Sequence, residues 1–323
     1  MRGTIGQILP LWGIGNAQLS QIYPTAWEVN HSHVIKVYDD KKQMERNIRI
    51  SEILSDCNIS VPKDKTIAWK MGTAIARLHT AFIQCEREVD FWDNSLLKEM
   101  KGWIRENLAE GEWETVSKEE YARAVDLLES VYHYLPKQLI HRDVHFGNFL
   151  FFEGDLSGYI DFDLSQRNIR IFDLCYFLTG LLAEETDDAF TKSEWMENIK
   201  AVIAGYESMI LLSEKEKIAI PWVMECIEIL FVAYFMGMKD RKHANDACQV
   251  FHFIQSCYHA ACSGTNDDES GWFSTFSSHM LPICCILILE TPVHYRARCN
   301  AWSSRARKVI SCRHPSCTND WRF

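Results

Sequence analysis

The sequence has no long hydrophobic run and no excess of basic residues. The longest apolar run, residues 280–289, contains Pro282 and is about half as long as the roughly 20 residues that span a bilayer. Acidic residues outnumber basic ones by 44 to 34, so the net charge is −10. Nonspecific affinity for nucleic acids comes mainly from Lys and Arg side chains. We therefore expect neither a membrane nor a nucleic acid among the partners of this protein.

The N-terminal segment lacks the features of a secretory signal peptide. A single early Arg2 is followed by a glycine-interrupted mixture, without an apolar core or a cleavage site of small residues. We therefore expect a cytoplasmic protein whose cysteines are reduced thiols. The 12 cysteines include no C-x₂-C pair, which is the usual signature of a structural zinc site.

The end of the chain differs in composition from the rest. Residues 291–323 contain seven basic residues and one acidic residue, whereas residues 1–290 contain 27 basic and 43 acidic ones. Seven of the 12 cysteines follow residue 256, and hydrophobic periodicity fades from residue 258 onward. We therefore expect residues 258–323 to form an irregular, poorly ordered extension rich in Cys and Arg.

Before residue 258, the hydrophobic pattern predicts a few strands and many helices. Short runs rich in β-branched and aromatic residues predict strands over 26–29, 33–38, 149–152 and 158–162. Apolar residues at every third or fourth position predict helices over 41–55, 66–82, 95–108, 118–134, 173–183, 192–208, 213–238 and 243–257. Ser193 and Ser213 are candidate N-caps for two of these helices.

The residues most informative about chemistry lie in two polar segments, HRDVHFGN (141–148) and IDFD (160–163). Phosphoryl transfer needs one carboxylate that orients the proton of the attacking hydroxyl, and oxygen ligands that hold Mg²⁺ against the phosphates. Asp143 suits the first role, and Asn148 and Asp161 suit the second. Lys36 lies in the strand VIKV, from which an ammonium group can neutralise the α- and β-phosphates.

These motifs resemble those of a phosphotransferase family that contains aminoglycoside kinases, choline kinases and homoserine-kinase-like enzymes. The resemblance covers roughly residues 33–254 and implies an α+β, protein-kinase-like bilobal fold. A reduced N-terminal β lobe for nucleotide binding would occupy residues 1–63, and a mainly helical catalytic C-terminal lobe would occupy residues 64–257. The implied cofactors are ATP and Mg²⁺. The implied partner is a small hydroxylated acceptor such as an aminoglycoside, an amino alcohol or a homoserine-like molecule.

The resemblance also implies a role for each matching residue. Asp143 would be the catalytic base, Asn148 and Asp161 the Mg²⁺ ligands, and Lys36 the phosphate-contacting lysine. Two further residues would support the catalytic loop, His141 by shaping it and Asp173 by bracing it through hydrogen bonds.

The N-terminal segment departs from the family pattern. It has no G-x-G-x-x-G motif, which leaves residues 20–25, including Ser20 and Thr25, as candidates to cover the phosphates. Glu45 is the nearest acidic partner for Lys36, although alignment on later residues favours Asn47 at that place. The connection after residues 61–63 is also too short for the two strands and adenine-binding hinge that the family places there.

Arg142 completes the triplet HRD, as in protein kinases, where this arginine contacts a phosphorylated activation loop. Asp173 follows Asp161 by only twelve positions, which leaves no room for such a loop. This spacing favours a small-molecule kinase, although it leaves a protein acceptor open.

Two alternatives to an active kinase remain at this point. A pseudokinase-like binding protein would keep the catalytic loop but bind ATP poorly because the hinge is missing. A zinc hydrolase would use His141, Asp143 and His145, whose alternate positions put three ligands on one face if the segment is a strand. The oligomeric state is left open.

Overall fold

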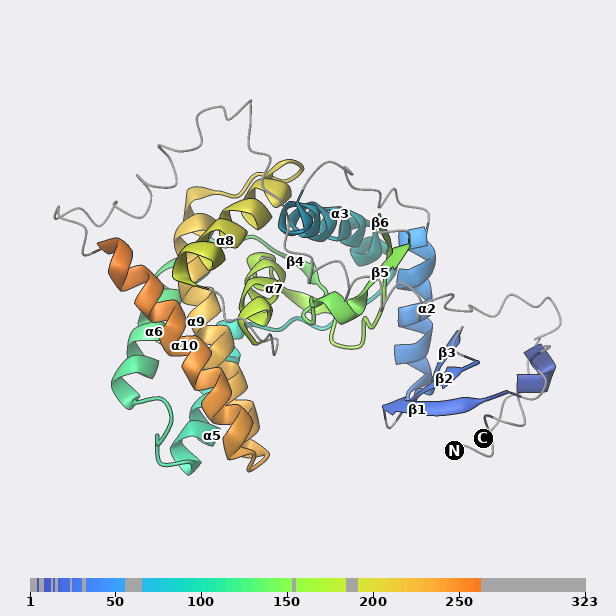
Figure 1. Ribbon diagram of the computed structural model, residues 1–323, viewed down its shortest axis with the longest axis horizontal. Coiled ribbons are helices and arrows are strands. Elements are labelled where there is room, and N and C mark those ends of the chain that lie inside the picture. The colour runs from blue at the N-terminus through green and yellow to red at the C-terminus, as the bar shows by residue number, and fades with distance from the viewer. Residues whose placement is uncertain are drawn as a thin grey trace.

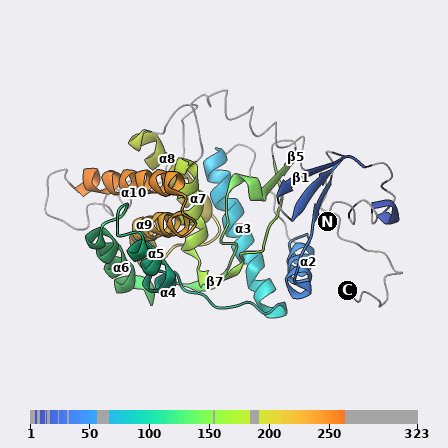
Figure 2. The ribbon, with the colours of Figure 1, turned by 90° about the horizontal axis from the view of Figure 1, so that it is seen from below.

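Two lobes of unequal size make up the fold (Figure 1). The computed structural model describes residues 5, 9–12, 14, 17–23, 25–30, 33–55, 66–152, 155–183 and 191–262. Figures 1 and 2 both show a small sheet with helix α2 at one end of the molecule and helices α5, α6, α9 and α10 at the other, with α3 between them. This is the α+β architecture that the sequence predicts.

The smaller lobe is built on a three-stranded antiparallel sheet of order β1-β2-β3. Its elements are the short 3₁₀ helix η1 (Leu9–Trp12) and the strands β1 (Leu19–Tyr23), β2 (Ala26–Val29) and β3 (His33–Lys36). Trp27 and Val29 pack with Ile5 and Leu9 in a small separate core. The strands predicted over 26–29 and 33–38 are confirmed as the antiparallel pair β2 and β3, whereas β1, an edge strand, was not predicted.

Helix α2 (Lys41–Ser55) follows the sheet and has the bounds predicted from its periodicity. Ile50 and Ile53 are buried in the main core, whereas Met44 and Ile48 are exposed. Residues 56–65, where the shortened connection was predicted, lie outside the described residues. The next element is already α3, which leaves eleven residues between the two helices. Two strands and their turns need more chain than that.

The larger lobe consists mainly of helices. They are α3 (Ile67–Glu88), α4 (Leu96–Glu99), the π-helical η2 (Met100–Ile104), α5 (Arg105–Glu110), α6 (Lys118–Tyr132), α7 (Ile171–Ala183), α8 (Lys192–Glu207), α9 (Glu214–Gly237) and α10 (Arg241–Cys262). Side-chain caps define several of their starts: Ser117, Thr191 and Ser213 each form a capping box with a glutamate three residues later. The cap of α8 is therefore Thr191 and not Ser193, because Thr191 is followed by Glu194 at the required spacing.

Two short antiparallel pairs carry the polar motifs into this lobe. β4 (Lys137–Ile140) pairs with β7 (Gln166–Ile169), and β5 (Phe149–Phe152) pairs with β6 (Asp155–Tyr159). The 3₁₀ turn η3 (Phe146–Asn148) joins residues 141–145, the expected catalytic loop, to β5. β7 was not predicted, because its sequence QRNI is polar although three of its four residues are buried.

Helices α3 and α8 cross at two glycines. A methyl group on Gly72 would lie 1.9 Å from the carbonyl oxygen of Val202, and one on Gly205 would lie 2.0 Å from the carbonyl oxygen of Trp69. Any side chain there would force the backbones apart. This contact packs α8 tightly against α3, whose later turn carries His79 to the active-site loop.

Helices α10 and α9 bear on two expectations from the sequence, the irregular C-terminal extension and the absence of a membrane partner. α10 continues to Cys262, so residues 258–262 are helical and not irregular, while residues 263–323 lie outside the described residues. Among the described helices, α9 is long and apolar enough to cross a membrane, but 72% of its most apolar stretch is buried inside the protein. A buried core helix of a globular lobe has the same composition.

Candidate active site

Asp173 anchors the catalytic loop to the start of α7. Its side chain is fully buried and accepts hydrogen bonds from the backbone N–H groups of His141 (2.8 Å) and Arg142 (2.7 Å). Nε2 of His79, from α3, lies 3.0 Å from the same carboxylate. Because a buried carboxylate needs several donors, these contacts fix where the loop leaves β4. They are the contacts that a bracing role requires.

Asp143 lies in this loop with both carboxylate oxygens engaged. Its Oδ1 accepts a hydrogen bond from the hydroxyl of Tyr176 (2.8 Å), and its Oδ2 accepts one from Nδ2 of Asn148 (3.0 Å). Burial raises the pKa of Asp143, but His145 and Tyr176 outweigh it through hydrogen bonds and charge and lower the pKa to about 2. Asp143 is therefore a carboxylate at neutral pH, able to accept a hydrogen bond from a substrate hydroxyl.

Lys36 joins the two lobes at the end of β3. Its Nζ lies 2.6 Å from Oδ1 of Asp161 and 2.5 Å from Oδ2 of Asp163. Burial lowers the pKa of Lys36, but the hydrogen bonds and negative charge of both aspartates outweigh it and raise the pKa above its ordinary value. Asn47 of α2 donates from Nδ2 to Oδ1 of Asp163 at 3.1 Å. Lys36, Asp161, Asp163 and Asn47 thus form one polar cluster between the lobes.

Glu45 was predicted as the partner of Lys36, whereas Ser20 and Thr25 were predicted to cover the phosphates. Glu45 is 58% exposed and pairs with Lys41 at 3.4 Å. Ser20 is exposed on the edge strand β1, opposite Glu28, and the carbonyl oxygen of Thr25 accepts the backbone N–H of Val37. Within the described residues, Lys36 is ion-paired with Asp161 and Asp163 and not with Glu45, and the backbone of Thr25 lies beside the end of β3 that carries Lys36.

The zinc-site hypothesis for His141, Asp143 and His145 is wrong. It required a strand, but β4 ends at Ile140 and these residues lie in a loop. The ring of His141 is buried and its Nε2 contacts the carbonyl oxygen of Ile160 (2.9 Å), while Nδ1 of His145 accepts the backbone N–H of Gly147. In the part of the chain that the structure describes, no three His, Cys, Asp or Glu residues are grouped to hold a metal ion.

Arg142 has a permanent carboxylate partner. Its guanidinium donates two hydrogen bonds to Glu99, at 2.7 and 2.9 Å, and a third to Gln166 (3.1 Å). Both bonds to Glu99 come from the same nitrogen, Nη2, and charge-assisted hydrogen bonds of this kind are stronger than neutral ones. Glu99 therefore neutralises the arginine of the HRD triplet without a phosphorylated loop, in agreement with the short spacing between Asp161 and Asp173.

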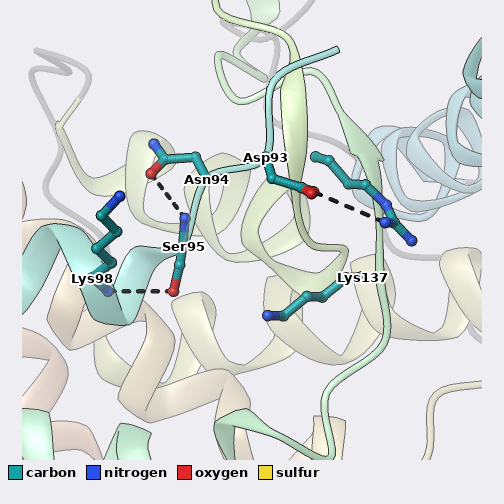
Figure 3. Close-up of a pocket in the computed structure, with 6 residues that line it drawn as sticks. Asp93, Asn94, Ser95, Lys98 and Lys137 are labelled. Atoms are coloured by element: carbon teal, nitrogen blue, oxygen red, sulfur yellow. Dashed lines mark hydrogen bonds and ion pairs between the residues drawn. The ribbon is translucent and has the colours of Figure 1, made fainter. Parts of the chain in front are cut away.

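A surface pocket of about 420 Å³ lies beside this contact, because Asn94, which lines it, donates to the same Oε1 of Gln166 as Arg142 does. It is lined by Asp93, Asn94, Ser95, Lys98, Lys137 and Arg167, and Figure 3 shows Asn94 and Ser95 beside Lys98, with Asp93 and Lys137 on the other side. Asp93 is paired with Arg167 at 3.9 Å. No predicted site residue lines this pocket, so it plays no part in the chemistry considered below.

The chain belongs to the phosphotransferase enzyme family, whose sequence profile matches residues 31–212. A homoserine kinase of Phenylobacterium zucineum (strain HLK1) is 36% identical over 87 residues, which are 27% of this chain and 25% of that protein. A homoserine kinase of Gluconacetobacter diazotrophicus is 32% identical over 87 residues, or 27% of this chain and 26% of that protein. The chain therefore matches about a quarter of the length of these curated relatives.

Solved structures of kinases share the fold. A GDP complex of wild-type aminoglycoside 2'-phosphotransferase-IIIa has a TM-score of 0.57 at 11% identity, covering 79% of this chain and 98% of that one. A microcompartment-associated aminopropanol kinase has a TM-score of 0.56 at 17% identity, covering 80% and 98%. A choline kinase from Cryptosporidium parvum Iowa II scores 0.55 at 15% identity, covering 80% and 96%. The predicted family and the kinase-like bilobal fold are confirmed.

Several residues of the site were missed by reasoning from the sequence. Asp163 was visible in the IDFD motif, but its contact with Lys36 was not. Tyr176 follows Asp173 by three positions, which places both on one face of a helix, and this spacing was the signal available. Glu99 is 43 positions from Arg142, and no local pattern joins them.

Proposed function

We propose that the protein is a cytoplasmic kinase that transfers the γ-phosphoryl group of ATP, with Mg²⁺, to the hydroxyl group of a small molecule. The observation that carries this proposal is the arrangement of Asp143, held as an ionised carboxylate, beside Asn148 and close to a lysine-aspartate contact that joins the lobes. Positioning and electrostatics supply most of the rate in phosphoryl transfer. The family membership supports the same reaction class.

The donor atoms around Asn148 and Asp161 fit a magnesium ion. Asn148 uses its amide nitrogen to bind Asp143, which leaves its amide oxygen to ligate a cation. Asp161 uses one oxygen for Lys36 and keeps the other. Amide and carboxylate oxygens are the ligands that Mg²⁺ prefers, whereas zinc favours Cys and His. When bound, Mg²⁺ would supply positive charge to the phosphates.

The residues of the chain would then divide the reaction among them. Asp143 would accept the hydrogen bond of the acceptor O–H and take its proton as the new O–P bond forms. The bond between the γ-phosphorus and the bridging oxygen breaks, and its electron pair leaves with ADP. Lys36 would neutralise phosphate oxygens, moving from its present contacts with Asp161 and Asp163.

The acceptor is proposed to be a homoserine-like amino alcohol. The support is the 36% identity to a homoserine kinase over 87 residues, which is a partial match. The strongly acidic charge of residues 1–290 suits a cationic amino group, although net charge bears on association and not on a particular site.

The test is Mg²⁺-dependent phosphoryl transfer from labelled ATP, measured for the wild type and for Asp143→Asn. The acceptors would be homoserine, choline, 1-amino-2-propanol, kanamycin and water. We expect one of the organic acceptors to be used, and Asp143→Asn to lower kcat by about 10²- to 10⁴-fold. Calorimetry with Mg²⁺-ATP separates binding from turnover.

Two results would contradict the proposal. If neither protein binds Mg²⁺-ATP, the chain is a binding protein of the pseudokinase kind. If both proteins turn over ATP equally, Asp143 is not the base. Full-length chain is used throughout, because residues beyond 262 have not been shown to be dispensable.

A further inference from the structure

Tyr176 of helix α7 contacts the proposed base directly. Its hydroxyl donates a hydrogen bond to Oδ1 of Asp143 at 2.8 Å, across 33 positions of sequence. We propose that Tyr176 is a positioning residue, which holds the carboxylate of Asp143 in the orientation that accepts the proton of the acceptor hydroxyl. This inference rests on the proposed function, because it assigns Tyr176 a role in that same reaction.

The backbone of α7 sets the position of Tyr176. Asp173, one turn earlier on the same helix, binds the backbone N–H groups of His141 and Arg142. Residues three positions apart lie on one face of a helix, so the helix that anchors the loop also presents Tyr176 to it. The distance between Tyr176 and Asp143 is therefore set by the same contact that fixes the loop.

The ring of Tyr176 is held by neighbouring aromatic rings. It stacks with Phe172 of α7 at a centroid distance of 6.0 Å and packs against Phe231 of α9 at 5.7 Å. Aromatic pairs at such distances are stabilising, and they keep the ring in place independently of its hydroxyl group. Removal of the hydroxyl alone should therefore leave the packing of the two helices intact.

Asp143 needs partners on both oxygens to have one orientation. The terminal torsion of an aspartate is broad, so the carboxylate rotates easily when it is free. Tyr176 binds Oδ1 and Asn148 binds Oδ2, and rotation would break both hydrogen bonds. Each carboxylate oxygen has two acceptor sites. Nε2 of His145 also lies 3.6 Å from Oδ2, so the site left for the acceptor hydroxyl is on Oδ1, beside Tyr176.

Tyr176 acts as a donor throughout the reaction. Burial raises the pKa of Tyr176 well above its ordinary value, and the charge of Asp143 raises it further. The phenol therefore keeps its proton, and the proton of the acceptor goes to Asp143 alone. A catalytic acid or base would have to exchange a proton, so the role of Tyr176 is orientation.

The matched variants are Tyr176→Phe and Tyr121→Phe. Both remove one phenolic hydroxyl that donates a hydrogen bond, but that of Tyr121 donates to the backbone carbonyl of Met100 (2.6 Å) in η2 and not to a carboxylate. Steady-state kinetics would use the best acceptor of the panel, or water if none reacts. We expect Tyr176→Phe to lower kcat about tenfold, because a carboxylate that rotates freely is less often oriented to accept the proton. The KM for Mg²⁺-ATP should change less than about twofold, because the change leaves the groups proposed to hold the nucleotide in place. Tyr121→Phe should keep the wild-type kcat.

A double-mutant cycle with Asp143→Asn distinguishes orientation from general structural damage. If Tyr176 acts through the carboxylate, Tyr176→Phe should cause little further loss of kcat in the Asp143→Asn background. A tenfold loss in both backgrounds, or an unchanged kcat for the single variant, would overturn the positioning role. In either case an active wild type leaves the proposed function standing. A wild type without turnover would instead refute the proposed function, and the role of Tyr176 with it.

Discussion

The two charged groups at the centre of the site are held in different ways. Asp143 is bound by Tyr176 and Asn148, which belong to its own helical lobe, and its side chain is 24% exposed. Lys36 reaches across the lobes to Asp161, whose side chain is 43% exposed. Exposed ion pairs add about 0–1 kcal/mol and are screened by salt. The orientation of Asp143 therefore depends on the helical lobe alone, whereas the position of Lys36 depends on the contact between the two lobes.

The largest effect on stability should come from Asp173→Ala, which removes the buried carboxylate that holds the loop after β4 to helix α7. The change leaves the backbone N–H groups of His141 and Arg142 without their buried acceptor. We expect a loss of about 3–5 kcal/mol in the free energy of unfolding, together with loss of kcat. Urea unfolding measures the change in the free energy of unfolding. Asp93→Ala, at a carboxylate whose side chain is 78% exposed, is the control and should change stability by less than about 0.5 kcal/mol. Equal stability of both variants would contradict the bracing role.

Gly205→Ala should have the next largest effect on stability, because it disrupts the contact between α3 and α8 in the same lobe. The added methyl group would meet the backbone of Trp69 at 2.0 Å. We expect a loss of about 1–3 kcal/mol. Gly180→Ala is the matched control, since a methyl group there meets nothing within 4 Å and alanine favours a helix. In thermal unfolding, the Tm of Gly205→Ala should lie below that of the wild type, and the Tm of Gly180→Ala should equal or exceed it. The reverse order would refute the close-contact interpretation.

A buried carboxylate of α9 should make the stability of this lobe depend on pH. Burial raises the pKa of Glu228 from 4.5 to about 8, against a smaller lowering by its hydrogen bond with Thr179. Between these values the folded protein keeps a proton that the unfolded chain releases, so stability falls as pH rises from 4.5 to about 8. Glu228→Gln should match the wild type near pH 5 and exceed it by on the order of 2 kcal/mol at pH 9. Parallel stability curves would show that Glu228 is not protonated in the folded protein.

The smallest effect on stability should come from Lys36→Met, which breaks the contact between the lobes. We expect a change of at most about 1 kcal/mol, reduced further by salt. Affinity for Mg²⁺-ATP should nevertheless fall about tenfold or more, because a charge-assisted contact to phosphate is lost. Lys41→Met, at a lysine that is 80% exposed, should keep wild-type affinity. A large loss of stability for Lys36→Met would show that the lobes depend on this cluster.

Local patterns predicted most helices but not their ends or the shortest strands. The bounds predicted for α2 from its amphipathic pattern agree with those of the structure. Helix α3 runs six residues past the predicted end at Phe82, over the polar segment that follows. β7 has no apolar alternation, since its inward residues Gln166 and Asn168 are polar and find their hydrogen-bond partners only across the fold.

The candidate site was predictable where it is contiguous in sequence. Asp143 and Asn148 lie five positions apart in one loop, and a hydrogen bond joins their side chains. By contrast, Glu45 and Asn47 were both candidates for the place beside Lys36, and the structure directs Asn47 inward, to Asp163. Two positions on a helix differ by about 200° in direction, so a small uncertainty in alignment exchanges a buried residue for an exposed one.

The sequence by itself determined the family and the kinds of chemical group available, because residue types and short spacings are local properties. Tertiary structure decided which groups meet. Lys36 and Asp161 are 125 positions apart, and Tyr176 and Asp143 are 33 apart. Such contacts depend on how strands and helices pack, and on side chains whose burial makes a missing partner costly. No spacing rule of a single element specifies them.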